Sequence, residues 1–480
     1  MSQTKRIKTI ASNTAWFFTS RAAEAVNSLL QIALVARYLG VNDFGVYSFL
    51  IVVCWTVLPL FMVLQRILVR DIAIDKGRVS EIVGTGLTLI GLSAPPILIV
   101  TMALLLIFKV ETIYFTALAI NVFAITFAAL NSVCTSVFIA FEKVKYETLV
   151  SFAISSMSLV FMLGVVHFDM GFNATFIAFM LSNLIGLLIS VVTIFRLGVR
   201  PAIKIDFGRM YYFIKECGFL AANQIIVQIY AYMGVFFLKK FATDYDLGLF
   251  QAPARLLNRL NVFPASFSVA LFPVIASLTA VTYQKEKIDY MITTAARLIL
   301  FATIPVSIAA FVLSDELVLL FFGSKYTYSA ALFRMMIMGI NFNFLIFVFE
   351  PLLIILHKQH SIFILNLILL TLSSALYYPL TKFNGAYGAS IAFFISNVLY
   401  LAMYLYFISS IVDLMPFLRR GYLPVVGGLC AFGLILFTAG NYPKFLVLAT
   451  ALAIYALFAM KAFTFDEIIF MKGLMKKREG

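Results

Sequence analysis

Runs of apolar residues, each about as long as a membrane-spanning helix, fill almost the whole chain, and short polar phrases separate them. A helix needs about 20 mostly apolar residues to cross the hydrocarbon core of a bilayer. By that measure the pattern predicts fourteen spanning helices, with turn and charge signals at their ends. The first seven fall in 10–36, 44–64, 82–108, 112–140, 147–167, 172–195 and 208–238. The second seven fall in 246–280, 290–313, 327–356, 361–380, 385–409, 421–440 and 443–461.

The composition agrees with this pattern. Of 480 residues, 63% are hydrophobic and only 12% are charged, whereas a soluble domain carries about 25% charged residues. We therefore expect an all-α polytopic membrane protein without a sizeable soluble domain.

The formal net charge of +14 is best explained by membrane topology. Lys and Arg accumulate in cytoplasmic loops. Fourteen spans place both termini on one side, and most of the 36 Lys and Arg residues fall on that side, Arg66 to Arg78 among them as a predicted inner loop. The sequence thus predicts cytoplasmic termini and no nucleic-acid partner.

A charged, glycine-punctuated phrase occurs twice in the chain. "RYLGVNDFGVY" at 37–47 returns as "KFATDYDLGLF" at 240–250, and the two align without a gap, Gly45 with Gly248. Each phrase follows the first helix of its set and opens the second, as a tight outer connection would. This recurrence predicts two six-helix lobes, 1–205 and 206–412, related by a pseudo-two-fold axis along the membrane normal. Residues 413–480 then form a helix pair and a basic cytoplasmic tail.

Charged residues also lie inside the predicted spans, where each costs about 2.5–3.5 kcal/mol and normally faces a cavity or a partner. Basic residues outnumber acidic ones in this set, which comprises Arg21, Lys215, Arg255, Arg259, Arg297, Arg334, Glu24, Glu216 and Glu350. Pairing cannot neutralise all of them, so we expect an anionic substrate between the lobes. The planar guanidinium of arginine binds phosphate through two hydrogen bonds. Arg21 and Arg259, near mid-membrane and one from each lobe, are the first candidates.

Arg255 shares the polar face of Arg259 and joins the predicted substrate site. Arg297 and Arg334 either extend the path or snorkel to the headgroups. Arg21 and Glu24 belong to a polar stripe that lines a cavity or, alternatively, closes a helix–helix contact. Glu24 and Glu350 are candidate ion-coupling sites, with a structural ion pair as the alternative. Three prolines, Pro253, Pro264 and Pro273, make residues 246–280 either a moving part or a statically curved helix.

Three phrases carry a resemblance to a known family. "NTAWFF", "ARYLGVNDFGVYS" and "LGLFQAPARLLNRLNVFPASFSVALFPVIASL" resemble the polysaccharide-transport flippases. These are O-antigen and capsule-repeat translocases of the superfamily that also holds multidrug exporters and lipid II flippases.

The resemblance implies alternating-access movement of a polyprenyl-pyrophosphate-linked oligosaccharide from the cytoplasmic to the outer leaflet of a bacterial inner membrane. It also implies membrane-lipid contacts, a polysaccharide polymerase and chain-length machinery as partners, and a lipid-tail groove at 421–461. A proton or sodium ion is the expected coupling ion. Because the sequence has no phosphate-binding Gly-x-x-x-x-Gly-Lys-[Ser/Thr] motif, we expect no ATP hydrolysis. We also expect no cofactor, and no metal because His357 and His360 have no third ligand in view.

Other functions make different demands on the sequence. A multidrug cation antiporter of the same superfamily would have twelve spans and an acidic cavity. A lipid II flippase of that superfamily is a further alternative. A membrane glycosyltransferase or polymerase would need a large outer loop for its catalytic groups. No predicted loop exceeds roughly 20 residues, so the sequence favours a transporter over an enzyme.

Overall fold

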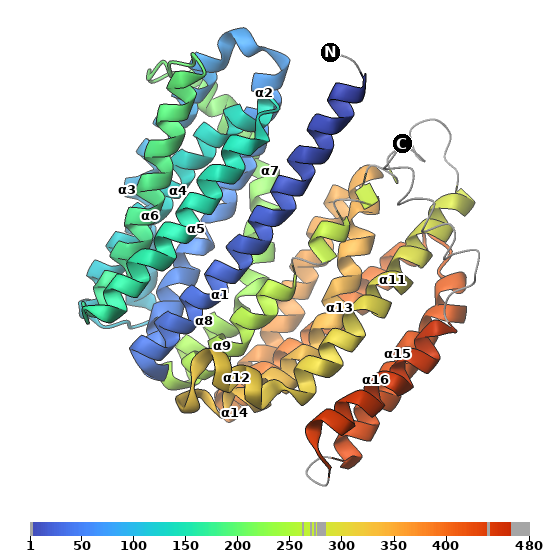
Figure 1. The fold of residues 1–480 in the computed structure, drawn as a ribbon. Coiled ribbons are helices and arrows are strands. Elements are labelled where there is room, and N and C mark those ends of the chain that lie inside the picture. The colour runs from blue at the N-terminus through green and yellow to red at the C-terminus, as the bar shows by residue number, and fades with distance from the viewer. Residues whose placement is uncertain are drawn as a thin grey trace. The chain divides into compact units, whose positions relative to one another are not determined.

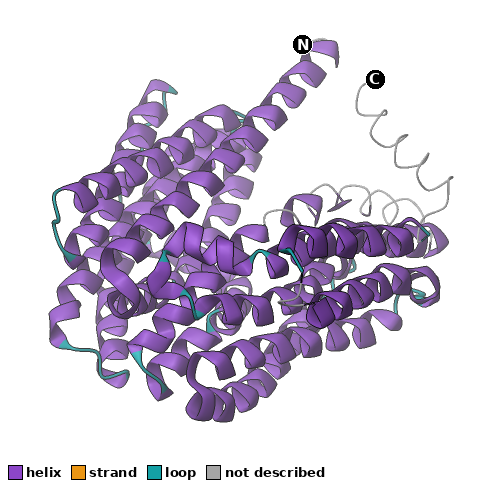
Figure 2. Ribbon diagram, turned by 60° about the horizontal axis from the view of Figure 1, so that its bottom comes forward, coloured by secondary structure: helices purple, strands orange, loops and turns teal. Residues whose placement is uncertain are grey.

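The computed structural model describes residues 3–261, 264–268, 271–272, 275, 285–438 and 442–461, with side chains from residue 24 onwards except at 285, 416 and 418–420. All regular structure in these residues is helical (Figure 2). A lipid bilayer offers the backbone no hydrogen-bond partners, so a chain of this hydropathy satisfies its peptide groups within helices. The predicted all-α polytopic fold is confirmed.

The chain forms two compact units, residues 1–251 and 252–480. The helices of the first unit are α1 (Gln3–Trp55), α2 (Leu58–Ile74), α3 (Val79–Ile107), α4 (Phe115–Ala140), α5 (Val144–His167), α6 (Phe172–Arg196), α7 (Phe207–Ala231) and α8 (Met233–Phe241). Helices α3 to α6 lie side by side, α1 packs along α5, and α7 packs along α2 (Figure 1). Helix α9 (Asp244–Leu260) begins in this unit and continues into the second.

The described helices of the second unit are α11 (Lys285–Val312), α12 (Ser314–Phe322), α13 (Ser329–Ile355), α14 (Gln359–Ser409), α15 (Met415–Thr438) and α16 (Lys444–Met460). Helix α13 packs against α11 and α14. The hairpin of α15 and α16 packs against α11 (Figure 1), where the Tyr455 hydroxyl donates to the carbonyl of Leu300 at 3.1 Å.

Two helices are too long for a single crossing. At about 1.5 Å per residue, α1 and α14 each exceed twice the length that a core of about 30 Å requires. Each is broken by a glycine with non-helical dihedrals, Gly40 at φ 74° and Gly385 at φ 51°. Only glycine adopts such angles readily, so each long helix is divided into two segments. Gly40 lies between two predicted spans, and Gly385 is the first residue of the predicted span 385–409.

Nine helices among the described residues are long and apolar enough to span a membrane, or ten if the bent pair α7–α8 forms one span. In this count the helix that contains Gly40 and the helix that contains Gly385 are each counted once. Much of the predicted span 246–280 lies outside the described residues. The number fourteen therefore stays a prediction.

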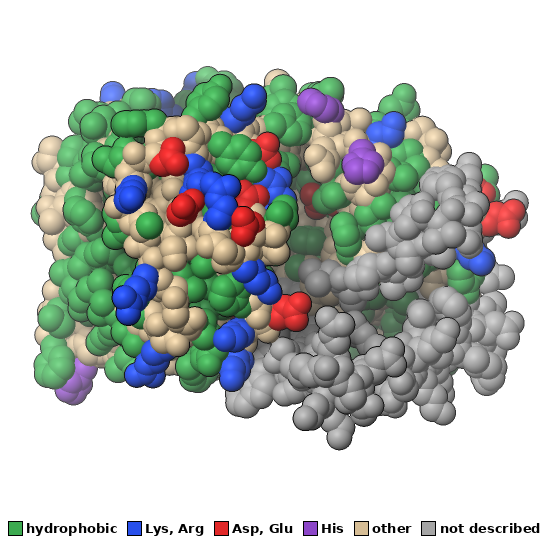
Figure 3. All heavy atoms as spheres, turned by 90° about the horizontal axis from the view of Figure 1, so that it is seen from above, with side chains coloured by type: hydrophobic (Ala, Val, Ile, Leu, Met, Phe, Trp, Pro, Cys, Tyr) green, Lys and Arg blue, Asp and Glu red, His purple; other side chains and the backbone are tan. Residues whose placement is uncertain are grey.

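The surface of the first unit suits a bilayer. Ile99 on α3 and Val160 on α5 are 69% and 54% exposed. Figure 3 shows hydrophobic side chains around the sides of this unit and charged side chains gathered on one end. Large exposed apolar areas mark contact with lipid or with another protein.

Candidate functional site

The polar stripe of α1 faces α5 over the part that is described. The amide of Asn27 donates to the hydroxyls of Ser155 and Ser156 at 3.3 Å, and Gln31 donates to Ser158 at 2.6 Å. Asn27 and Gln31 therefore form a helix–helix contact, and the role of Arg21 and Glu24 in the stripe stays a prediction. Glu24 lies one turn earlier and is half-buried, and the side chain of Arg21 lies outside the described residues.

Two predicted arginines lie one turn apart on α9. Arg255 is buried, with 8% of its surface exposed, and Arg259 is half-buried. Pro253 lies inside α9, and the helix continues through it. The segment that contains Pro264 and Pro273 is only partly described. The structure thus keeps Arg255 and Arg259 on one continuous helix.

Arg297 is deeply buried on α11. Only 3% of it is exposed, and its guanidinium donates to the Thr293 carbonyl at 3.4 Å and to the Thr294 hydroxyl at 3.1 Å. A snorkelling side chain would expose its charged end, so snorkelling is excluded for this residue.

Arg334 takes part in an ion-pair cluster. Its guanidinium contacts the Asp315 carboxylate of α12 at 2.5 Å. Lys444, the first residue of α16, contacts Asp315 at 3.0 Å and Glu316 at 2.8 Å. The cluster joins α12, α13 and α16, which gives Arg334 a structural partner that the sequence did not reveal.

Glu350 lies half-buried on α13, next to a polar cluster of α14. It acts electrostatically on Tyr400 and Tyr404, whose rings meet edge to face at 5.0 Å. The Tyr400 hydroxyl also bonds to the amide oxygen of Asn366 at 3.1 Å. Carboxylate, phenol and amide oxygens therefore gather within the second unit.

The prediction that Arg66 and Arg70 lie in an inner loop is wrong. Both lie inside α2, which continues to Ile74 because Ile67, Leu68 and Ile72 extend its buried face. Arg70 binds α7 through Glu216 at 3.1 Å and the Tyr212 hydroxyl at 2.7 Å. The guanidinium of Arg209 contacts Glu81 of α3 at 2.8 Å.

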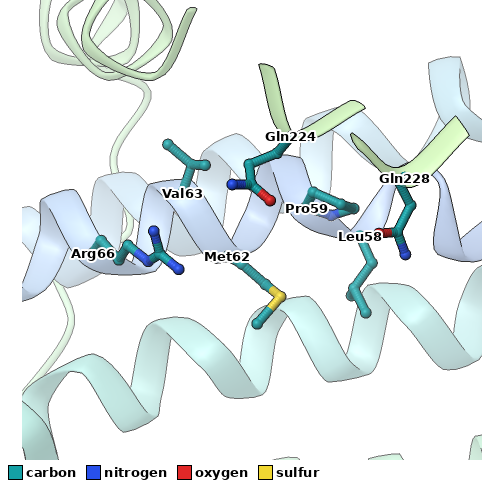
Figure 4. Close-up of a pocket in the computed structure, with 7 residues that line it drawn as sticks. All are labelled: Leu58, Pro59, Met62, Val63, Arg66, Gln224 and Gln228. Atoms are coloured by element: carbon teal, nitrogen blue, oxygen red, sulfur yellow. The ribbon is translucent and has the colours of Figure 1, made fainter. Parts of the chain in front are cut away.

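One turn along α2 from Arg70, a cavity of about 140 Å³ lies between α2 and α7. Its lining comprises Leu58, Pro59, Met62, Val63, Arg66, Gln224 and Gln228 (Figure 4). The sequence signal was a spacing in multiples of four residues, 58, 62, 66 and 70 on one helix and 216, 224 and 228 on the other. That signal has meaning only once the two helices are known to be neighbours.

The repeated phrases meet each other within the first unit. A Cβ atom at Gly45 would overlap the backbone carbonyl of Asp244, and one at Gly248 would overlap that of Val41. Val41 and Asp244 are themselves equivalent in the alignment of the phrases, so the contact is reciprocal. Reciprocal contacts between equivalent residues are the mark of a two-fold arrangement.

The chain is similar to known transporters in sequence and in fold. The chain is 22% identical over 414 residues to a Shigella flexneri protein described as an O-antigen transporter, covering 81% of this chain and 95% of that protein. Among solved structures, the lipid II flippase MurJ in an inward closed conformation is similar, with a TM-score of 0.70 at 15% identity over 97% of this chain and 100% of that one.

An inward-facing multidrug resistance transporter of the MATE family gives a TM-score of 0.66 at 13% identity, over 80% of this chain and 93% of that one. At such identities the structures establish a shared fold. Residues 10–279, more than half of the sequence, match the family described as polysaccharide biosynthesis protein. The chain therefore belongs to the polysaccharide biosynthesis protein family.

Proposed function

We propose that this chain is a flippase that moves a polyprenyl-pyrophosphate-linked oligosaccharide, an O-antigen or capsule-type repeat unit, from the cytoplasmic to the outer leaflet of a bacterial inner membrane. The observation that carries the proposal is membership of the polysaccharide biosynthesis family over residues 10–279. The transporter fold and the O-antigen transporter description of the Shigella relative support it.

The buried arginines suit such a substrate. Arg255 and Arg297 are 8% and 3% exposed. A guanidinium stays charged when buried, and pyrophosphate oxygens match its hydrogen-bond geometry. In this proposal Arg255, Arg259, Arg297 and Arg21 contact the anionic head, whereas Arg334 serves the ion-pair cluster with Asp315.

Glu350 is the proposed coupling site for a proton or a sodium ion. Oxygen ligands suit hard cations, and the Glu350 carboxylate lies within electrostatic range of Tyr400, whose hydroxyl donates to Asn366. Glu24 remains a second candidate on α1. A drug–cation antiporter would use these acids too, but it would not need buried arginines such as Arg255.

The proposal is tested by mass spectrometry of lipids from cells that lack only this chain. We expect a polyprenyl-pyrophosphate oligosaccharide to accumulate and re-expression of the chain to relieve the accumulation. Accumulation of lipid II would instead identify a lipid II flippase. Retention of cationic dyes with unchanged lipids would overturn the proposal in favour of a drug exporter.

The same proposal includes the wider setting. Both termini lie in the cytoplasm, residues 1–205 and 206–412 act as the two lobes of alternating access, and the helix pair of 413–480 holds the lipid tail. A polysaccharide polymerase and its chain-length machinery then use the exported unit.

A further inference from the structure

Helices α2 and α7 run antiparallel in one register within the first unit. Leu58 and Gln228 line the same cavity, as do Met62 and Gln224, and Arg70 binds Glu216. Glu216, the acidic residue of α7, contacts Arg70, and no ion pair joins Arg66 to α7 among the described residues.

The polar side chains around the cavity lack partners in the part of the chain that the structure describes. Among the described residues, no carboxylate lies within ion-pair distance of Arg66, and no hydrogen bond engages the side-chain amides of Gln224 or Gln228. Figure 4 shows both glutamines extending from α7 towards α2, with Arg66 at one end of the cavity and Leu58 at the other. Arg66 is exposed and both glutamines are half-buried, so these groups are accessible to a ligand in the cavity.

We propose that this cavity, defined by Arg66, Gln224 and Gln228, is a substrate subsite for an anionic group that carries hydroxyls, such as an acidic sugar or a sugar phosphate. The inference rests on the proposed function and adds to it a specific contact site for the head of the transported lipid. None of the residues predicted from the sequence to bind substrate belongs to it.

The chemistry of the lining selects this ligand class. A guanidinium donates to carboxylate or phosphate oxygens, and each carboxamide offers donors and an acceptor, which suits hydroxyl groups. The apolar wall of Leu58, Pro59 and Met62 can cover the carbon face of a sugar ring. Cavities for whole drug-sized ligands measure about 300–1,000 Å³, so a cavity of about 140 Å³ holds one part of a larger head.

Arg66 does not act as a topology signal at the end of its helix. It lies eight residues before Ile74, which is about 12 Å along the helix axis. Arg70 and its partners already occupy the turn between Arg66 and that end. A charged side chain within a membrane-spanning helix, away from the ion pairs near the helix end, typically lies on a substrate path.

The first test is in cells that lack the chain and are complemented with variants. Arg66→Ala and the double variant Gln224→Leu, Gln228→Leu should each lower export about tenfold at equal abundance, and Arg66→Lys should restore part of it. Arg200→Ala, which removes an exposed arginine outside the cavity, is the matched control and should export normally. If wild-type protein fails to relieve lipid accumulation, the proposed function fails. If wild type relieves it and both cavity variants export normally, only the subsite is wrong.

The second test identifies the source of the bound anion, because a phospholipid headgroup offers similar chemistry. Purified wild type and Arg66→Ala are heated with the lipid fraction that accumulates in the deletion strain or with phosphatidylglycerol. A ligand that binds only the folded state raises the melting temperature. We expect the accumulated fraction to stabilise wild type more than Arg66→Ala, and phosphatidylglycerol to affect both equally. If Arg66→Ala loses stabilisation by phosphatidylglycerol but keeps stabilisation by the accumulated fraction, the cavity does not bind substrate and the proposed subsite is wrong.

Discussion

Individual charged residues fall into two groups according to their burial. Arg70 and Arg334 have side chains that are 48% and 35% exposed and pair with acids. Such exposed pairs contribute about 0–1 kcal/mol each. Arg255 and Arg297 are buried, and burying a charge costs several kcal/mol before its contacts offset the loss of hydration. Buried ionisable groups of this kind are frequent at functional sites.

The buried Arg255 is expected to contribute to export. Arg255→Ala should lower export about tenfold or more, because truncating one member of a buried charge-assisted contact costs about 2–5 kcal/mol. Arg255→Lys should retain part of the activity, since the charge remains but the planar fork is lost. Surface polysaccharide is measured against protein abundance, with Arg200→Ala as the control. Normal export by Arg255→Ala would remove this residue from the proposed site.

At the scale of elements, short contacts decide how helices join. The reciprocal approach of Gly45 and Gly248 leaves no room for a side chain on either segment. The α12–α16 contact depends instead on charge, through Asp315, Glu316 and Lys444. One contact should therefore respond to side-chain volume and the other to pH.

Adding a methyl group at the glycine contact should destabilise the first unit. Gly45→Ala and Gly248→Ala should each lower the free energy of unfolding by about 1–3 kcal/mol, as overpacking does. The double variant should cost less than the sum, because one separation of the segments relieves both clashes. Gly91→Ala is the control, since a Cβ atom there meets nothing within 4 Å. Thermal unfolding in detergent compares these four variants with wild type, and unchanged stability of Gly45→Ala would contradict the contact.

The α12–α16 contact should weaken in acid. A hydrogen bond from Lys444 holds the pKa of Glu316 below its usual range. The stabilisation is therefore present above the unfolded-state pKa, near 4.3, and is lost as the pH falls through the lower folded-state pKa. Wild type should be more stable than Glu316→Gln at pH 7, by at most about 1 kcal/mol for an exposed pair, and the difference should vanish in strong acid. A difference in melting temperature that grows on acidification would contradict this assignment.

At the scale of the whole molecule, charge sets the orientation in the membrane. The correction at Arg66 and Arg70 moves two cations from a loop into α2. It leaves the basic residues at Lys76, Arg78 and the chain ends, which still favour cytoplasmic termini. The orientation thus does not depend on the corrected positions.

Reporter fusions after residue 480 test this orientation. A fluorescent protein that folds only in the cytoplasm should be bright there, and alkaline phosphatase, which needs the oxidising outer side, should be inactive. The reverse pattern would mean an odd number of spans or the opposite orientation. A fusion within the loop that follows α3, around Lys109, serves as the outer-side control.

The sequence by itself determined the class of fold. Long apolar runs leave the backbone no alternative to helices in lipid, and this dependence is local, so the pattern alone predicts it. It also placed span boundaries within a few residues of the breaks at Gly40 and Gly385, and it found the paired phrases around Gly45 and Gly248. Each of these signals lies within a few residues of the feature that it predicts.

The tertiary structure alone decided which polar residues meet. Asn27 and Gln31 reach serines of α5 more than a hundred positions away, Arg334 pairs with Asp315, and Arg66 shares a cavity with Gln224. Helical periodicity gives the face on which a side chain lies but not the helix opposite that face. Partners across a seam depend on packing and register between distant segments, and only the folded chain brings those segments together.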